Sequence, residues 1–250
     1  MKKLLYLFAA ILLVFTSCSK DDNDSTSSIL PKKVTTVYSD GNTETQKIVY
    51  NGNKIVSITD QAGSVMKYTY TGDFITKVEE LDKDGKLDTT TDYSYVNGKL
   101  NAGVEKNANP NDPYYYKTKY VHNADGTVSY DNFRGLISTG VEQEYGSTGK
   151  YTFKDGNLLK LEVSSYGIEY SYVYEYDTKN HPLKNVVGLN LLLDDSYVNN
   201  IVAETSTSGS GTNIRTSSKV YTYKYDANNY PTEQVKSYED GKQTVVQFVY

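Results

Sequence analysis

Tyrosine recurs at every second position in several stretches of this chain, which holds 26 Tyr, 6 Phe and no Trp. A spacing of two places side chains on the same face of a β-strand, whereas a helical face needs a spacing of three or four. The intervening residues, such as Lys67, Thr69 and Glu175, are polar. The pattern therefore predicts strands with one aromatic face and one water-facing side. The runs are Tyr68–Tyr70, Tyr93–Tyr95, Tyr114–Tyr116, Tyr172–Tyr176 and Tyr221–Tyr225.

Turn dipeptides follow these tyrosine strands and predict β-hairpins. Asn-Gly and Asp-Gly accept the positive φ values that two-residue hairpin turns require. An aliphatic strand follows each turn, and a second turn, often with glycine, closes a repeat of about 20 to 30 residues. The first turns are Asn51-Gly52, Thr71-Gly72, Asn97-Gly98, Asp125-Gly126 and Asp155-Gly156, and the second turns contain Gly63, Gly85, Gly146, Gly167 and Gly241.

One segment, residues 185–204, interrupts the repeat. It carries four leucines between Leu189 and Leu193 without alternation. We expect a short helical insertion near residues 188–195 that packs on the aromatic face, and a buried strand is the alternative because short apolar runs do not distinguish the two. The Ser- and Gly-rich stretch Ser206–Thr212 predicts a flexible loop.

Together these patterns predict an all-β fold, a large antiparallel meander of roughly fifteen strands. Strands joined by hairpins normally pair with their chain neighbours. A single sheet this wide would expose its tyrosine face unless it curled, and closure also removes the sheet edges. We therefore expect a soluble barrel that is either flattened or filled by the Leu189–Leu193 segment.

The N-terminus has the features of a lipoprotein signal peptide. Two lysines precede a mostly apolar run, Leu4–Phe15, and the small residues before Cys18 suit a cleavage site. Residues Phe15 to Cys18 resemble a bacterial lipobox, although its first position is usually Leu. The resemblance implies lipidation of Cys18, the single cysteine of the chain. The apolar run is too short to span a bilayer as a helix.

The residues after Cys18 are polar and acidic. Ser19, Lys20, Asp21 and Asp22 resemble the surface-export signal of Bacteroidota lipoproteins, which implies an outer-membrane protein that faces the cell exterior. A solvated tether is the alternative interpretation of the same composition. We expect a signal peptide over residues 1–17, a tether over 18–33 and one folded domain over 34–250.

The hairpin repeat resembles a known group. The unit Tyr-x-Tyr, then Asp or Asn, Gly and an aliphatic strand is similar to the tyrosine-aspartate (YD) repeat of the RHS type. Only Tyr176-Asp177 and Tyr225-Asp226 keep that dipeptide after a strand. The insertion that begins at Asn180 is similar to Bacteroidota lipoproteins of unknown function that include a domain with a porin-like fold. That resemblance implies a large antiparallel barrel and brings no catalytic residues.

A barrel inserted in the membrane is a further alternative. The last residues, Val246–Tyr250, resemble the aromatic-ended final strand of outer-membrane barrels. Membrane strands need about 9 to 11 residues with an outward apolar band, and most strands expected here are shorter. The sequence therefore favours a barrel that is attached to the membrane by lipid alone.

The net charge and the sequence motifs limit the classes of function that fit this chain. The chain carries −5, or −7 without the two lysines of the signal peptide, which disfavours nucleic acid as a partner. His122 and His181 lie beside expected turns, with no nucleophile motif near them. The loop with Asp82, Asp84 and Asp88 is a weak candidate for a cation, because Glu80 and Thr91 stand where an EF-type loop needs Asp and Glu. We expect no metal, no cofactor and no catalytic residues, although a paired-carboxylate site has no sequence spacing to reveal it.

Tyr114, Tyr115 and Tyr116 are the candidate binding residues. Three consecutive residues of a strand cannot share a face, so Tyr115 should point away from its neighbours and offer an exposed aromatic contact. The leading hypothesis is a non-enzymatic surface lipoprotein that binds a glycan or protein partner. The alternatives are a polysaccharide or peptide hydrolase, or its accessory subunit, and a carrier of a small apolar ligand inside the barrel.

Overall fold

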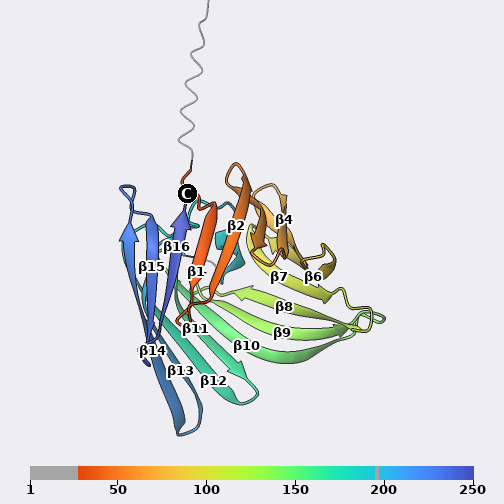
Figure 1. The fold of residues 1–250 in the computed structure, drawn as a ribbon. Helices are drawn as coiled ribbons and strands as arrows, with labels where there is room; N and C mark the ends of the chain where they lie inside the picture. Colours follow the sequence, from red (N-terminus) through yellow and green to blue (C-terminus); the bar gives the residue numbers. More distant parts are fainter. Residues whose placement is uncertain (1–27, 195–196) are drawn as a thin grey trace, which may run out of the picture.

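The alternating segments form strands, and each strand pairs antiparallel with its chain neighbours. The computed structural model describes residues 28–194 and 197–250. β1 and β16 also pair, with Lys33 opposite Val249, so the 16 strands form a closed barrel (Figure 1). The predicted all-β meander of about fifteen strands is confirmed. In chain order the strands are β1 (Lys33–Val37), β2 (Thr43–Asn51), β3 (Lys54–Asp60), β4 (Val65–Thr71), β5 (Phe74–Leu81), β6 (Leu87–Val96), β7 (Lys99–Asn107), β8 (Tyr114–His122), β9 (Val128–Leu136), β10 (Glu142–Lys154), β11 (Asn157–Ser165), β12 (Ile168–Tyr176), β13 (Ile201–Ser210), β14 (Asn213–Tyr225), β15 (Pro231–Tyr238) and β16 (Gln243–Val249).

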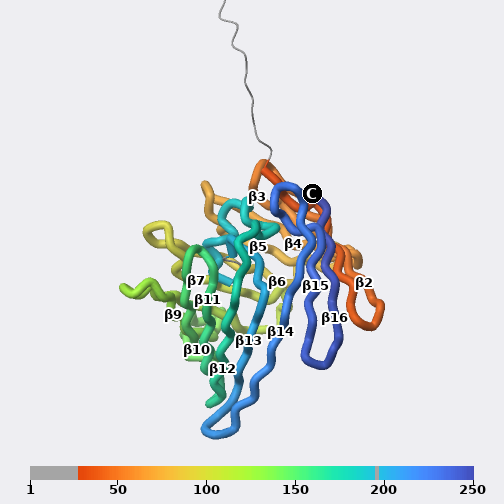
Figure 2. Tube along the Cα trace, turned by 90° about the vertical axis from the view of Figure 1, so that its left-hand side faces the viewer, coloured from red at the N-terminus to blue at the C-terminus, as the bar shows by residue number. Residues whose placement is uncertain are grey.

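The barrel has two ends that differ in what covers them. The chain enters β1 and leaves β16 at the same end, which we call the entry end (Figure 1). The hairpin turns that follow even-numbered strands also lie there, because consecutive strands are antiparallel. The turns after odd-numbered strands lie at the far end, where the long β13–β14 hairpin projects beyond the other strands (Figure 2).

The hairpin turns follow the predicted chemistry with some differences in position. Asn97 and Gly98 both have positive φ, 51° and 76°, as a type I′ turn requires. Asn51 instead pairs with Lys54, so the turn residues there are Gly52 and Asn53, one position later than predicted. The glycine supplies the positive φ in both cases, and the flanking strand register decides its place.

Two sequence predictions about loops are wrong. The stretch Ser206–Thr212, predicted as a flexible loop, is mostly strand, because Ser206 to Ser210 pair with residues of β14 before a tight turn. Gly146, predicted in a turn, lies within β10, where the register with β9 shifts between Glu144 and Thr148. Small and β-branched residues pair as strands when a neighbouring strand supplies hydrogen bonds, and the extra residues of β10 are absorbed as a bulge.

The predicted helical insertion fills part of the barrel. The connection from β12 to β13, residues 177–200, contains one turn of 3₁₀-helix, η1 (Leu189–Leu192). We call this connection the plug; residues 195 and 196 lie outside the described ranges. Val186 and Leu189 join one core cluster with Ile48, Ile55 and Ile75. Further residues of the plug, Leu192 and Leu193, pack with a second cluster that includes Leu100, Leu158 and Tyr151.

Hydrogen bonds fasten the plug at the entry end. The Val187 N–H donates to the Asn53 carbonyl over 3.0 Å, and the Asn180 N–H donates to the Asn229 carbonyl over 3.0 Å. Asp177 joins the two ends of the plug, because its carboxylate accepts hydrogen bonds from the backbone N–H and the side-chain amide of Asn200. The plug is thus held by the β2–β3 and β14–β15 turns, which are four strands apart around the barrel.

Tyrosine hydroxyls make a repeated contact at the entry end. A tyrosine near the end of an even-numbered strand donates to a backbone carbonyl at or just before the start of the preceding strand, which we call a tyrosine latch. His122 takes the same place in β8, with Nε2 2.9 Å from the Leu100 carbonyl. These contacts explain why the repeat uses Tyr rather than Phe, since a buried carbonyl needs a donor. The latches run from Tyr50 to Pro31, Tyr95 to Ile75, Tyr176 to Leu158, Tyr223 to Ile201 and Tyr250 to Pro231.

The folded part begins before β1. Leu30 is buried in the first core cluster, and the Pro31 carbonyl accepts the Tyr50 latch. Residues that belong to the predicted tether, 18–33, therefore take part in the packing of the barrel. No helix within residues 28–194 and 197–250 combines the length and the apolar character that crossing a membrane requires.

Candidate functional site

The main cavity lies inside the barrel between β6 and the plug. Its volume is about 440 Å³. Residues of β6 to β11 form the wall, and Asp194 contributes from the plug. We call it the tyrosine cavity because four tyrosines line it. The lining residues are Thr91, Tyr93, Gly103, Glu105, Tyr116, Lys117, Thr118, Tyr120, Asn132, Phe133, Tyr145, Gly146, Ser147, Ser165 and Asp194.

The bulge in β10 shapes one side of this cavity. Between Glu144 and Thr148 the strand has more residues than β9 opposite, and Gly146 takes a φ of 80°. Such bulges change the direction of the side chains beside them. Here the bulge brings the Tyr145 ring to 5.7 Å from the Tyr116 ring, measured between centroids.

Polar side chains form a fixed row across three strands of the wall. The Thr118 hydroxyl donates to Asn132 Oδ1 over 2.8 Å, and Asn132 Nδ2 donates to the Ser147 hydroxyl over 3.1 Å. Because both ends of the amide are engaged, its orientation is set before any ligand arrives. The row leaves further lone pairs and hydroxyl hydrogens for a bound molecule.

Two carboxylates line the same cavity, Glu105 from β7 and Asp194 from the plug. The Tyr151 hydroxyl donates to Asp194 over 2.7 Å. Burial raises the pKa of Asp194, while the hydrogen bond from Tyr151 opposes that shift. Burial also raises the pKa of Tyr120, so its phenol remains protonated at neutral pH. The cavity therefore presents hydroxyl donors beside carboxylate acceptors.

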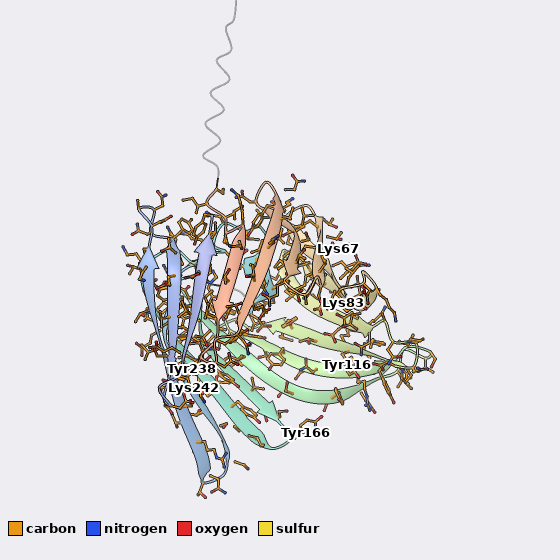
Figure 3. All side chains as sticks on the ribbon, viewed as in Figure 1. Lys67, Lys83, Tyr116, Tyr166, Tyr238 and Lys242 are labelled. Carbon is orange, nitrogen blue, oxygen red and sulfur yellow. The ribbon has the colours of Figure 1, made fainter. Side chains whose placement is uncertain are left out.

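The predicted binding residues Tyr114, Tyr115 and Tyr116 divide between the two faces of β8. Tyr116 lines the tyrosine cavity, and its place in the barrel is labelled in Figure 3. The Arg134 guanidinium lies between rings, with Cζ 4.3 Å from the Tyr114 centroid and 4.8 Å from the Tyr145 centroid. Arg134 Nε is buried without a hydrogen-bond acceptor among the described residues. Stacking on tyrosine faces therefore holds this cation.

Tyr115 points to the outer face, as the alternation predicts, but it does not project into solvent. It lies opposite Gly135 in the register of β8 and β9. A Cβ atom at Gly135 would lie 2.1 Å from the Tyr115 ring, so the ring covers the glycine. The Tyr115 hydroxyl donates to Glu142 over 3.1 Å, and Lys117 also binds that carboxylate. This half-buried ring is part of the wall.

The other residues considered from the sequence lie away from the tyrosine cavity. Asp82 Oδ1 accepts the backbone N–H groups of Asp84 and Lys86 within the β5–β6 turn, and Asp84 pairs with Lys83. In the described ranges no group of three or more His, Cys, Asp or Glu side chains is placed to hold a metal ion. Cys18 and the predicted export residues Ser19, Lys20, Asp21 and Asp22 lie outside the described residues.

Sequence reasoning did not find the residues that build the cavity. Tyr145 and Ser147 follow no alternation because the bulge breaks it, and Asn132 looks like any polar strand residue. Asp194 stands at the end of the leucine run, where its carboxylate was one acid among many. Only Tyr116 belongs to both the predicted set and the cavity.

Comparisons with known proteins identify a similar fold. No family model matches the chain, and no curated protein matches it. A solved structure, a porin-like protein from Bacteroides uniformis, matches with a TM-score of 0.53 at 11% sequence identity. The match covers 88% of this chain and 96% of the other. At this identity the likeness supports a porin-like barrel fold and carries no functional residues.

Proposed function

We propose that the protein binds a small carbohydrate without catalysis, and that the tyrosine cavity is the binding site. The observation that carries the proposal is the combination on one wall of Tyr116 and Tyr145 with the fixed Thr118–Asn132–Ser147 row. Aromatic faces pack against the C–H faces of a sugar ring, and tyrosine hydroxyls add hydrogen bonds. Convergent polar groups within a concave aromatic wall are typical of a ligand site.

The size and charge of the cavity narrow the ligand. A volume of about 440 Å³ lies at the lower end of the range for small-molecule sites, which suits one or two sugar rings. The two carboxylates Glu105 and Asp194 outnumber the one lysine of this wall, Lys117, which favours ligands rich in hydroxyl donors and disfavours ligands with several negative charges. The proposed ligand is therefore a neutral or amino-bearing mono- or disaccharide.

The proposed location is the outer membrane, with the protein anchored by lipid on Cys18 and facing the cell exterior. The charged side chains on the outer face of the barrel support a barrel that lies in water rather than in the bilayer. Lysine and acidic side chains pair across neighbouring strands there, and a membrane barrel needs an apolar outer band instead. Such pairs are Lys77 with Asp92, Lys150 with Glu162 and Lys224 with Glu233. Fatty-acid labelling that persists in a Cys18→Ala variant would refute the anchor.

The binding test uses the purified full-length protein in detergent and a panel of neutral, amino and acidic mono- and disaccharides. We expect calorimetry to find a ligand whose affinity falls at least tenfold in Tyr116→Ala and in Asn132→Ala. The matched control is Tyr38→Ala, since Tyr38 is exposed in the β1–β2 turn outside the cavity. Binding that is absent at millimolar sugar, or weakened equally by the control, would contradict the proposal.

A hydrolase is the second candidate, because Glu105 and Asp194 share the cavity. A carboxyl group with a raised pKa is suited to act as a general acid, and burial raises that of Asp194. The bound sugar would then be cleaved, and both Glu105→Gln and Asp194→Asn would lower the rate at least a hundredfold. Stable binding of an intact oligosaccharide over hours would instead favour the non-catalytic function.

A further inference from the structure

A second cavity lies inside the barrel on the opposite side of the plug from the tyrosine cavity. Its volume is about 290 Å³. Its wall comes from β1 to β3 and β13 to β16, whereas β6 to β11 surround the tyrosine cavity. We call it the apolar cavity. It is lined by Pro31, Val34, Gln46, Ile48, Ile58, His181, Pro182, Leu183, Tyr197, Asn200, Ile201, Tyr221, Tyr223, Gln234 and Phe248.

The polar groups in this wall are mostly engaged with the protein itself. The Tyr223 hydroxyl donates to the Ile201 carbonyl over 2.7 Å and accepts from Gln234 Nε2 over 2.7 Å. The Tyr221 hydroxyl donates to Glu204. Aliphatic and aromatic surface therefore forms the main contact for any occupant.

Asn200 borders the cavity but offers almost no surface to an occupant. Its side chain is 1% exposed, and its Nδ2 donates to Asp177 and to the Asn180 carbonyl. These bonds to acceptors fix the amide orientation, so the remaining atom must be Oδ1. Asn200 Oδ1 is buried without a donor among the described residues. The same burial closes Oδ1 to a water-sized group, so an occupant of the cavity would not reach this acceptor.

His181 adds a second polar group that stays neutral. Its ring packs against Tyr197 with 5.6 Å between centroids, and its Nδ1 accepts the Leu183 N–H over 3.4 Å. Burial lowers the pKa of His181 to about 4, although Asp177 opposes that shift. The cavity therefore offers no positive charge from His181 to attract an anion at neutral pH.

The hollow next to the apolar cavity is acidic. Gln46 and Ile58 line both this cavity and a neighbouring hollow toward the far end. That hollow is lined by carboxylates that would repel an approaching anion. They are Glu44, Asp60, Glu80, Asp82 and Asp88.

We infer that the apolar cavity binds a small, uncharged hydrophobic molecule of about two fused rings. A dry cavity of about 150 Å³ holds benzene, and this one is roughly twice that size. The site is separate from the proposed sugar site, and each can fail independently of the other.

The test compares two probes of the same ring system on the full-length protein, the uncharged 2-naphthol and the anionic 2-naphthoate. Ligand-observed NMR titrations should show saturable binding of 2-naphthol, because the wall of the cavity is mainly aliphatic and aromatic. We expect no binding of 2-naphthoate. Absence of 2-naphthol binding, or equal binding of 2-naphthoate, would overturn the inference.

Two variants of β3 locate the probe. Ile58→Trp fills the apolar cavity and should abolish 2-naphthol binding, while sugar binding is retained. The matched control, Val56→Trp, places the same side chain on the outer face, where Val56 is 43% exposed, and should bind as before. Retained 2-naphthol binding in a folded Ile58→Trp variant would refute the location, and the probe comparison on the unaltered protein remains decisive if that variant does not fold.

Discussion

Acidification should destabilise the barrel through His181 in the plug. The unfolded chain binds a proton at this residue near pH 6.5, whereas the folded protein resists it until about pH 4 because the ring is buried. Stability from the neutral ring is therefore present above pH 6.5 and is lost as the pH falls toward 4. Proton linkage with these two pKa values predicts that the free energy of unfolding falls by about 2 kcal/mol between pH 7.5 and pH 5.

The assay is urea unfolding at pH 7.5, 6.5 and 5.0, followed by tyrosine fluorescence because the chain has no Trp. The His181→Phe variant keeps the volume of the ring and removes the titrating group. The difference in unfolding free energy between variant and wild type should therefore change by about 2 kcal/mol from pH 7.5 to pH 5.0. The lost Leu183 N–H acceptor weakens the variant equally at each pH. Tyr38→Phe in the exposed β1–β2 turn is the control and should keep the wild-type pH dependence. Identical pH profiles for wild type and His181→Phe would refute the reasoning.

Three further predictions concern packing and hydrogen bonding. Gly149→Ala should lower the free energy of unfolding in urea by about 1 to 3 kcal/mol, because the new Cβ would lie 2.4 Å from a backbone carbonyl oxygen. Gly135→Ala should lower it by less, because the new Cβ there meets only the movable Tyr115 ring. Equal losses in the two variants would contradict this difference. Tyr95→Phe removes a latch and should lower the unfolding free energy by about 1 kcal/mol or more, since a buried carbonyl loses its donor; an unchanged urea midpoint would argue against the latch. Asp194→Asn should raise stability at pH 7. Burial raises the pKa of Asp194 in the folded protein, so the stability that its neutral form contributes is lost as the pH rises through that pKa. A higher melting temperature for the wild type than for the variant at pH 7 would contradict the raised pKa.

The strand content and the inward face could be predicted because the alternation of Tyr with polar residues leaves one face to bury. Tyr68 and Tyr70 pack against the core, while Thr69 between them is exposed. Closure was predictable as well, because an open sheet of this width would leave those rings in water. The turn positions were less certain, since Gly52 begins its turn where Asn51 was expected to do so.

The cavities could not be predicted from the sequence because they depend on what the plug does not fill. The leucine run indicates that the segment is buried. No local sequence pattern indicates that Leu189 joins the core cluster of Ile75 while Leu193 joins that of Leu158. The bulge at Gly146 is equally hidden, because a glycine in a polar stretch resembles a turn. Asn200 carries no motif, and its free acceptor follows only from the orientation that Asp177 imposes.

Tyr95 binds Ile75 and Tyr176 binds Leu158, and these latches join residues that are 20 and 18 positions apart in the chain. Each such unit carries its own turn, its own inward ring and its own fastening to the preceding strand. A duplicated hairpin would therefore bring with it the turn, the inward ring and the latch that the new copy needs. Related chains should then differ in barrel circumference by steps of two strands, while the plug, which must span the enclosed space, would have to change in length with each step.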